Sequence, residues 1–107
     1  MIYSFMRMIV FFDLPMNSKK KVRTYTQFRK FLIKSGFSMM QFSIYCKVFN
    51  NVEVAQAYLK ILKKNVPMQG QIRIMIVTEK QYNDIEIIIG GKSKQEEKIT
   101  IDPFVLF

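Results

Sequence analysis

The sequence predicts a single α+β domain in which two helices cover the same face of an antiparallel sheet. The chain has 107 residues and half of them are hydrophobic, which suits one modest core. Apolar, β-prone runs are separated by two segments with the three-to-four-residue spacing of amphipathic helices. The expected order is strand, helix, a split or bent strand, helix, strand and a further C-terminal strand. This order corresponds to a ferredoxin-like β-α-β-β-α-β sandwich with an additional C-terminal strand.

The first strand is expected at Met6–Asp13, where an apolar run ends in a single acid and a Leu-Pro turn follows. A helix comes next: Asn17 or Ser18 can cap its N-terminus, and Gly36 is placed to end it after about Ser35. Its apolar positions recur every three or four residues, which predicts one buried face. These positions are Val22, Tyr25, Phe28 and Leu32.

Residues Phe37–Phe49 are apolar and alternate in a pattern that predicts either one bent strand or two strands joined near Met39–Gln41. The second helix is expected at about Val52–Asn65, after an Asn-Asn cap and before the helix-stopping Pro67. Glu53 lies in its first turn and three lysines lie in its last turns. Because this charge order agrees with the helix dipole, these lysines need no functional explanation.

The C-terminal part contains an expected strand at Gln71–Thr78, a polar turn or short helix at Glu79–Asp84, and another strand at Ile85–Ile89. A polar connector with two adjacent glycines follows, and the last residues turn apolar again. The predicted boundaries are a ferredoxin-like domain at residues 1–91 and a connector with a C-terminal docking tail at residues 92–107.

The expected sheet is apolar on both of its faces. In the first strand Ile9 and Phe11 point away from the residues between them, and only Arg7 and Arg73 interrupt the helix-free face. A bare antiparallel sheet would alternate apolar and polar residues, and covering apolar area is favourable by ~25 cal/mol per Å². We therefore predict a homodimer through the sheet face. The alternative is a C-terminal segment that folds back over that face.

Charge and composition restrict the partners and the chemistry. The net charge is +9, from 17 Lys and Arg against 8 Asp and Glu, which favours a polyanion such as nucleic acid or an acidic membrane surface. No apolar run approaches the ~20 residues of a membrane span, the N-terminus lacks a signal-peptide pattern, and Cys46 is the single cysteine. We expect a cytoplasmic protein without a membrane partner. The absence of histidine excludes His zinc sites and Cys–His nucleophile pairs.

The join between the first strand and the first helix is the most informative stretch. Lys19, Lys20 and Lys21 stand in the first helical turn, where they repel one another and oppose the helix dipole. Cations at a helix start favour a bound phosphate; the alternative is a solvated charge run. Asp13, at the end of the strand, could hold a metal ion or could simply initiate the Leu-Pro turn.

Several short motifs are shared with one known family. They are Phe12-Asp13, Pro15 before a basic helix start, Lys34–Phe37 at the helix exit, and Gln41–Tyr45. Together with the order of elements, over residues from about 6 to about 90, they resemble the CRISPR-associated protein two family. The resemblance implies a small ferredoxin-like homodimer of the CRISPR adaptation machinery. It would lie between two dimers of the CRISPR integrase, in a complex that captures short duplex DNA and inserts it into the repeat array.

The resemblance also implies roles for particular residues. Asp13 takes the position of the metal-binding residue, and of the catalytic residue in those members described as metal-dependent nucleases on RNA or duplex DNA. One Mg²⁺ per dimer would be the cofactor. Lys19, Lys20, Lys21 and Arg23 occupy the basic stretch that touches the DNA backbone. Lysines stand where many members have arginines, which keeps the attraction to phosphate but weakens a bidentate grip.

Three functions remain as alternatives. The one we favour is a non-catalytic dimeric adaptor of spacer acquisition, which binds the backbone of duplex prespacer DNA and bridges integrase dimers. The second is a Mg²⁺-dependent endonuclease, either an endoribonuclease or a double-stranded deoxyribonuclease, that uses Asp13 paired across the dimer. The third is a ferredoxin-like RNA-binding module that stacks bases on Phe11 and Tyr45.

The apolar C-terminal tail is predicted to be a docking segment. Phe104, Val105, Leu106 and Phe107 follow a proline at a chain end, where an apolar segment frays unless something holds it. An edge strand through Lys98–Ile101 could pair with the sister protomer or with the integrase. The alternative is that the tail packs on its own domain.

Overall fold

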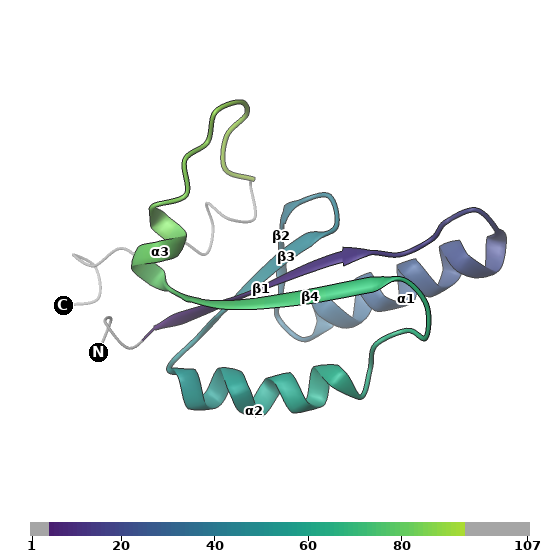
Figure 1. Ribbon diagram of the computed structural model, residues 1–107, viewed down its shortest axis with the longest axis horizontal. Helices are drawn as coiled ribbons and strands as arrows, with labels where there is room; N and C mark the ends of the chain where they lie inside the picture. Colours follow the sequence, from purple (N-terminus) through teal and green to yellow (C-terminus); the bar gives the residue numbers. More distant parts are fainter. Residues whose placement is uncertain (1–4, 94–107) are drawn as a thin grey trace.

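The computed structural model describes residues 5–93, which form a four-stranded antiparallel sheet and three helices (Figure 1). The strands lie in the order β2-β3-β1-β4, with α1 and α2 on one side of the sheet and α3 on the other (Figure 1). This arrangement confirms the α+β ferredoxin-like class, whereas the homodimer stays a prediction. The elements are β1 Met6–Asp13, α1 Lys19–Lys34, β2 Ser38–Gln41, β3 Ile44–Phe49, α2 Val52–Lys63, β4 Gln71–Thr78 and α3 Glu79–Asn83.

The strand β1 lies in the middle of the sheet, at the bounds the sequence predicts. It pairs antiparallel with both neighbours, so that Ile9 is opposite Cys46 of β3 and Met75 of β4. Alternate residues of β1 pack under α1 and α2, while Ile9 packs on the other side of the sheet. The main core therefore lies between the sheet and the two long helices. Its buried residues include Met8, Val10, Phe12, Tyr25, Phe28, Leu32, Tyr45, Phe49, Ala55 and Leu62.

The helix α1 begins and ends as its capping residues indicate. Ser18 rather than Asn17 is the N-cap, and its Oγ accepts a hydrogen bond from the Lys21 amide at 3.2 Å. At the other end Gly36 adopts a φ of +99°, which favours glycine. The Lys47 Nζ donates to the Ser35 carbonyl at 2.6 Å, and this cation complements the partial negative charge of the helix C-terminus.

The β-prone stretch after α1 forms two strands, and the turn between them comes later than predicted. β2 and β3 are joined at Phe42-Ser43, while the predicted join near Met39–Gln41 contains an irregularity in the strand pairing instead. Ser43 is the only non-glycine residue with a positive φ, +65°, among residues 5–93. A left-handed residue at this point allows the chain to reverse in a short turn.

One end of the helix-free face is covered by α3. Arg7, which we expected to interrupt an open apolar face, is instead completely buried there. Its guanidinium makes an ion pair with Glu79, at 2.9 Å from Nη2 to Oε1, and lies over the ring of Tyr82 at 3.8 Å from the centroid. Tyr82 packs with Ile9 and Cys46 against the sheet. The chain thus covers one end of this face itself, while Met75 remains exposed on β4.

The prediction of a strand at Ile85–Ile89 is wrong. These residues have no strand pairing among residues 5–93, and Ile88 and Ile89 are 91% and 93% exposed. The physical reason is that α3 directs the chain away from the sheet, so that the segment projects from the domain (Figure 1). Within residues 5–93 the segment pairs with no strand, so its β-prone composition alone does not make it one. The predicted edge strand at Lys98–Ile101 and the tail at Phe104–Phe107 lie outside the described residues.

Candidate nucleic-acid interface

Asp13 is exposed at the C-terminal end of β1, opposite Gln71 of β4. Because side chains alternate along a strand and Phe12 points into the core, Asp13 lies on the helix-free side together with Phe11. A shallow depression of about 290 Å³ surrounds it, and its lining includes Phe11, Phe42, Gln71 and Arg73. The carboxylate therefore stands beside an arginine and aromatic rings at one end of the sheet.

The position of Asp13 is maintained by a close backbone approach at Gly70. Gly70 has a φ of +96°, and a Cβ placed on it would lie 2.7 Å from the Asp13 carbonyl oxygen and 2.6 Å from Leu14 Cδ2. A contact that short has no room for a side chain, so only glycine allows the start of β4 to lie against the end of β1. Gly70 is a residue beside the candidate site that the sequence did not single out.

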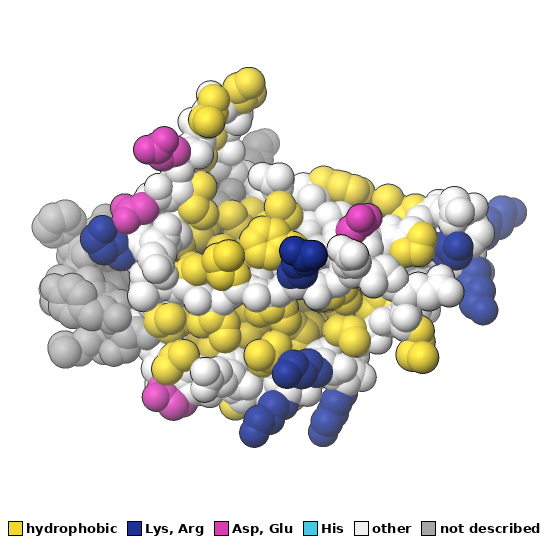
Figure 2. Space-filling model, in the orientation of Figure 1, with side chains coloured by type: hydrophobic (Ala, Val, Ile, Leu, Met, Phe, Trp, Pro, Cys, Tyr) yellow, Lys and Arg dark blue, Asp and Glu magenta, His cyan; other side chains and the backbone are white. Residues whose placement is uncertain are grey.

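The basic start of α1 is open to solvent. Lys19, Lys20 and Arg23 are exposed and Lys21 is half-buried, and the first turn has no acidic residue. Within residues 5–93 none of these four side chains makes an ion pair. Figure 2 shows basic side chains gathered at the end of the molecule where α1 begins. Their charge adds to the positive end of the helix dipole, so this end attracts anions.

The lysines and Asp13 line separate depressions. Lys20 and Lys21 border a depression of about 470 Å³ that is lined by Leu14, Pro15 and, from the loop before β4, Met68. Asp13 borders the smaller depression on the helix-free side. The structure therefore brings the predicted site residues to the same end of the domain without joining them into one site.

Among the described residues that line the depression at Asp13, Asp13 is the one carboxylate. Among the described residues no three Asp, Glu, Cys or His side chains come together in a group that could hold a metal. Mg²⁺ usually takes one or two carboxylates plus waters or phosphate oxygens. Asp13 can supply one such ligand.

Tyr45, one of the two aromatic residues proposed to stack RNA bases, cannot do so. It is buried on the helix side, where its ring packs 5.6 Å from that of Phe12 and its hydroxyl accepts a hydrogen bond from Arg29 Nε at 2.8 Å. Phe11 lies on the opposite face, so the two rings do not form one surface. Within residues 5–93 the exposed aromatic ring is that of Phe42, which sequence reasoning missed. The signal available in the sequence was its position between two β-prone segments.

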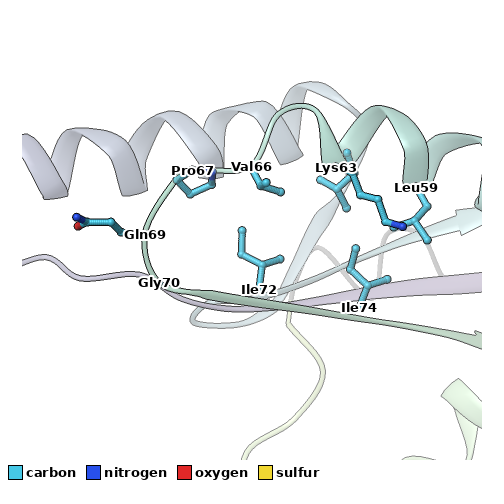
Figure 3. Close-up of a pocket in the computed structure, with 9 residues that line it drawn as sticks. Leu59, Lys63, Val66, Pro67, Gln69, Gly70, Ile72 and Ile74 are labelled. Carbon is cyan, nitrogen blue, oxygen red and sulfur yellow. The ribbon is translucent and has the colours of Figure 1, made fainter.

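A second concave surface lies between α2 and the edge strand β4. This groove of about 470 Å³ is lined mainly by apolar side chains, with Leu59 and Val66 facing Ile72 and Ile74 across it and Lys63 at its rim (Figure 3). Among the described residues β4 pairs only with β1 and forms the edge of the sheet. An apolar groove beside a strand edge is suited to a protein segment rather than to phosphate.

No helix within residues 5–93 has the length and apolar character needed to cross a bilayer.

Comparison with known proteins gives consistent results. Residues 6–85 match the family model described as CRISPR associated protein Cas2. A CRISPR-associated endoribonuclease Cas2 from Acidovorax ebreus is 42% identical over 95% of this chain and 100% of its own length. One from Treponema denticola is 48% identical over 85% of this chain and 89% of its own. A solved structure described as "Crystal structure of cas2" superposes with a TM-score of 0.53 at 18% identity, covering 85% of this chain and 92% of its own, which supports the fold.

Proposed function

The chain belongs to the CRISPR associated protein Cas2 family, and on that premise we propose that it is a dimeric adaptor of spacer acquisition. In this role it binds the phosphate backbone of duplex prespacer DNA and bridges dimers of the CRISPR integrase. Contacts of this kind carry no sequence information and weaken steeply with salt.

The observation that carries the proposal is the exposed basic start of α1. Lys19, Lys20, Lys21 and Arg23 oppose the helix dipole and have no acid in the first turn to compensate them, which costs folding stability. A bound phosphate would remove that cost, because backbone amides at a helix start and cations both favour anions. A twofold dimer would present two such clusters to one duplex.

Dimerisation and integrase docking complete the proposal. The exposed part of the helix-free face, the open edge of β4 and the α2–β4 groove are three surfaces of the described residues that a second chain can cover. We propose that the apolar tail at Phe104–Phe107 serves as a docking segment for the partner protomer or the integrase.

The test compares two triple variants that remove the same positive charge. Lys19→Ala/Lys20→Ala/Lys21→Ala should weaken duplex binding and lower the slope of log affinity against log salt by up to about 2.7. The matched control, Lys60→Ala/Lys63→Ala/Lys64→Ala on α2, should bind nearly as the wild type, because those lysines only complement the end of their own helix. Equal loss in both variants would mean that net charge, not the α1 cluster, governs binding.

A second candidate function is a metal-dependent endonuclease. It is favoured by the name of the relatives, CRISPR-associated endoribonuclease Cas2, and by the exposed Asp13 beside Arg73. In a dimer the two Asp13 carboxylates would hold one Mg²⁺, which would polarise a phosphodiester and activate water when bound. Arg73 would orient the phosphate.

Asp13→Asn separates the two functions because it keeps the shape of the side chain and removes its charge. If the protein is an adaptor, Asp13→Asn should retain DNA capture and integration. If it is a nuclease, the same variant should lose Mg²⁺-dependent cleavage of RNA or duplex DNA. Wild-type protein that supports integration but shows no metal-dependent cleavage would reject the enzymatic reading.

A further inference from the structure

Phe42 is a large apolar side chain placed in an exposed turn. It lies between β2 and β3, and 67% of the residue is exposed. Its ring stacks on Tyr25 of α1, with centroids 5.7 Å apart and an interplanar angle of 21°. Because Tyr25 is itself buried, one side of the Phe42 ring rests on a fixed support while much of the rest faces solvent.

The turn that carries Phe42 is held in a costly conformation. Ser43 has a φ of +65°, a region that few non-glycine residues adopt and that costs of order 1–3 kcal/mol. The Ser43 carbonyl accepts a hydrogen bond from the Phe12 amide at 3.0 Å, and its Oγ lies 3.0 Å from the Tyr25 hydroxyl. These contacts fix the neighbour of Phe42 to both β1 and α1, so the ring is held in place before any ligand binds.

The surroundings of the ring include a cation suited to phosphate. Arg73 is exposed, lies opposite Phe11 in the pairing of β1 with β4, and lines the same depression as Phe42. Its guanidinium makes no ion pair within residues 5–93 and offers the planar donor set that recognises phosphate. Asp13 borders the depression too and repels anions, which directs a phosphate toward Arg73.

We propose that this depression binds one unpaired nucleotide, with its base stacked on Phe42 and its phosphate held by Arg73. A flat apolar ring beside an exposed cation, on a chain of net charge +9, matches the two halves of a nucleotide. In a continuous duplex both faces of a base are covered by its neighbours, so only a single strand or a frayed end can reach Phe42. The depression is separate from the one that Lys20 and Lys21 border, and it contains Asp13 and Arg73, the two residues named for the second candidate function.

The test uses tryptophan fluorescence, because the chain contains no tryptophan. In Phe42→Trp the indole becomes the single reporter, and a base stacked on it should quench its emission when short adenine oligonucleotides are added. Val54→Trp, an exposed apolar position at the start of α2, is the matched control and should show no quenching. RNA and DNA oligonucleotides are compared in parallel. Tighter binding of RNA would identify the ligand of the depression as an RNA strand, and equal or tighter binding of DNA would identify it as a frayed DNA end.

Affinity measurements on side-chain variants complete the test. Phe42→Ala and Phe42→Leu should weaken single-strand binding about fivefold or more, measured by anisotropy, while Phe42→Tyr retains it. Arg73→Gln should lower the salt slope for single strands by about 0.7. Blunt duplex binding should be unchanged in the three Phe42 variants, and the α1 triple-lysine variant should still show quenching, which separates this proposal from the adaptor function. Equal quenching in Phe42→Trp and Val54→Trp would overturn the proposal, and so would wild-type affinity in a folded Phe42→Leu. A Phe42 variant that lost only the mass of the dimer, with single-strand binding unchanged, would overturn it too.

Discussion

Glu79→Ala should destabilise the domain strongly, because it removes the ion-pair partner of a buried guanidinium. The side chains of Arg7 and Glu79 are 1% and 12% exposed, and Arg7 donates to both carboxylate oxygens. Deleting one partner of a buried pair typically costs about 3–5 kcal/mol. We expect the free energy of unfolding to fall by about 3 kcal/mol, the lower end of this range. Glu79 keeps some contact with water, and detaching α3 would let water reach Arg7.

Thermal unfolding followed by circular dichroism measures this loss. For a domain of this size 1 kcal/mol shifts Tm by about 4–8 °C, so Glu79→Ala should lower Tm by roughly 12–24 °C. The neighbouring pair Lys80–Asp84 is a matched control: its atoms are 3.0 Å apart, but its side chains are 85% and 64% exposed. Asp84→Ala should therefore change stability by less than about 0.5 kcal/mol. A Tm for Glu79→Ala within about 2 °C of the wild type would refute the reasoning.

The same pair has a defined pH dependence. Burial lowers the pKa of Arg7, but the hydrogen bond and charge of Glu79 outweigh it, so the pKa is raised above its ordinary value. A raised folded-state pKa means that the contribution of the guanidinium is fully present below its unfolded-state pKa and is lost only as pH rises through the folded one. The free energy of unfolding, measured at increasing pH above neutral, should show no decrease attributable to Arg7 until the pH is strongly basic.

Three further outcomes are expected. Gly70→Ala should cost about 1–3 kcal/mol in chemical denaturation and shift the amide resonances of Asp13 and Leu14, since its Cβ would meet their atoms; unchanged resonances would contradict the close approach. Light scattering should give the mass of a homodimer at micromolar concentration, and a monomer would end both the adaptor geometry and the shared metal site. Truncation after Gly91 should abolish integrase binding and leave the dimer intact if the tail docks on the integrase. It should dissociate the dimer if the tail pairs with the sister protomer, and lower the free energy of unfolding if the tail packs on its own domain. No change in any of these three quantities would show that the tail is dispensable.

The elements that the sequence predicted well are those whose signals are local. β1 and β4 were predicted at their observed bounds because their apolar runs end at Asp13 and at Thr78, and both long helices were placed by cap residues and periodic apolar faces. Asp13 and the α1 lysines were found for the same reason, since each stands at an element end where its charge is conspicuous.

The features that escaped prediction depend on residues far apart in the chain. The partner of Arg7 lies 72 positions away, so no local pattern indicates that this arginine is buried. Tyr45 and Ile44 both belong to an apolar strand, and only the pairing of Tyr45 with Val10 decides which of them faces the helices. Ile85–Ile89 has a strand-like composition, but whether it pairs depends on where α3 sends the chain.

The open edge of β4 also has a consequence for how the protein behaves in a test tube. Within residues 5–93 the outer backbone groups of β4 have no strand partner, and with the β-branched residues Ile72, Ile74 and Ile76 they form a template for uncontrolled strand addition between molecules. Mutual repulsion from the net charge of +9 opposes such contacts in dilute buffer. A polyanion neutralises that repulsion, so substoichiometric nucleic acid at low salt should cause the protein molecules to associate and make the solution turbid. Turbidity recorded beside each titration will therefore distinguish discrete complexes from colloidal association.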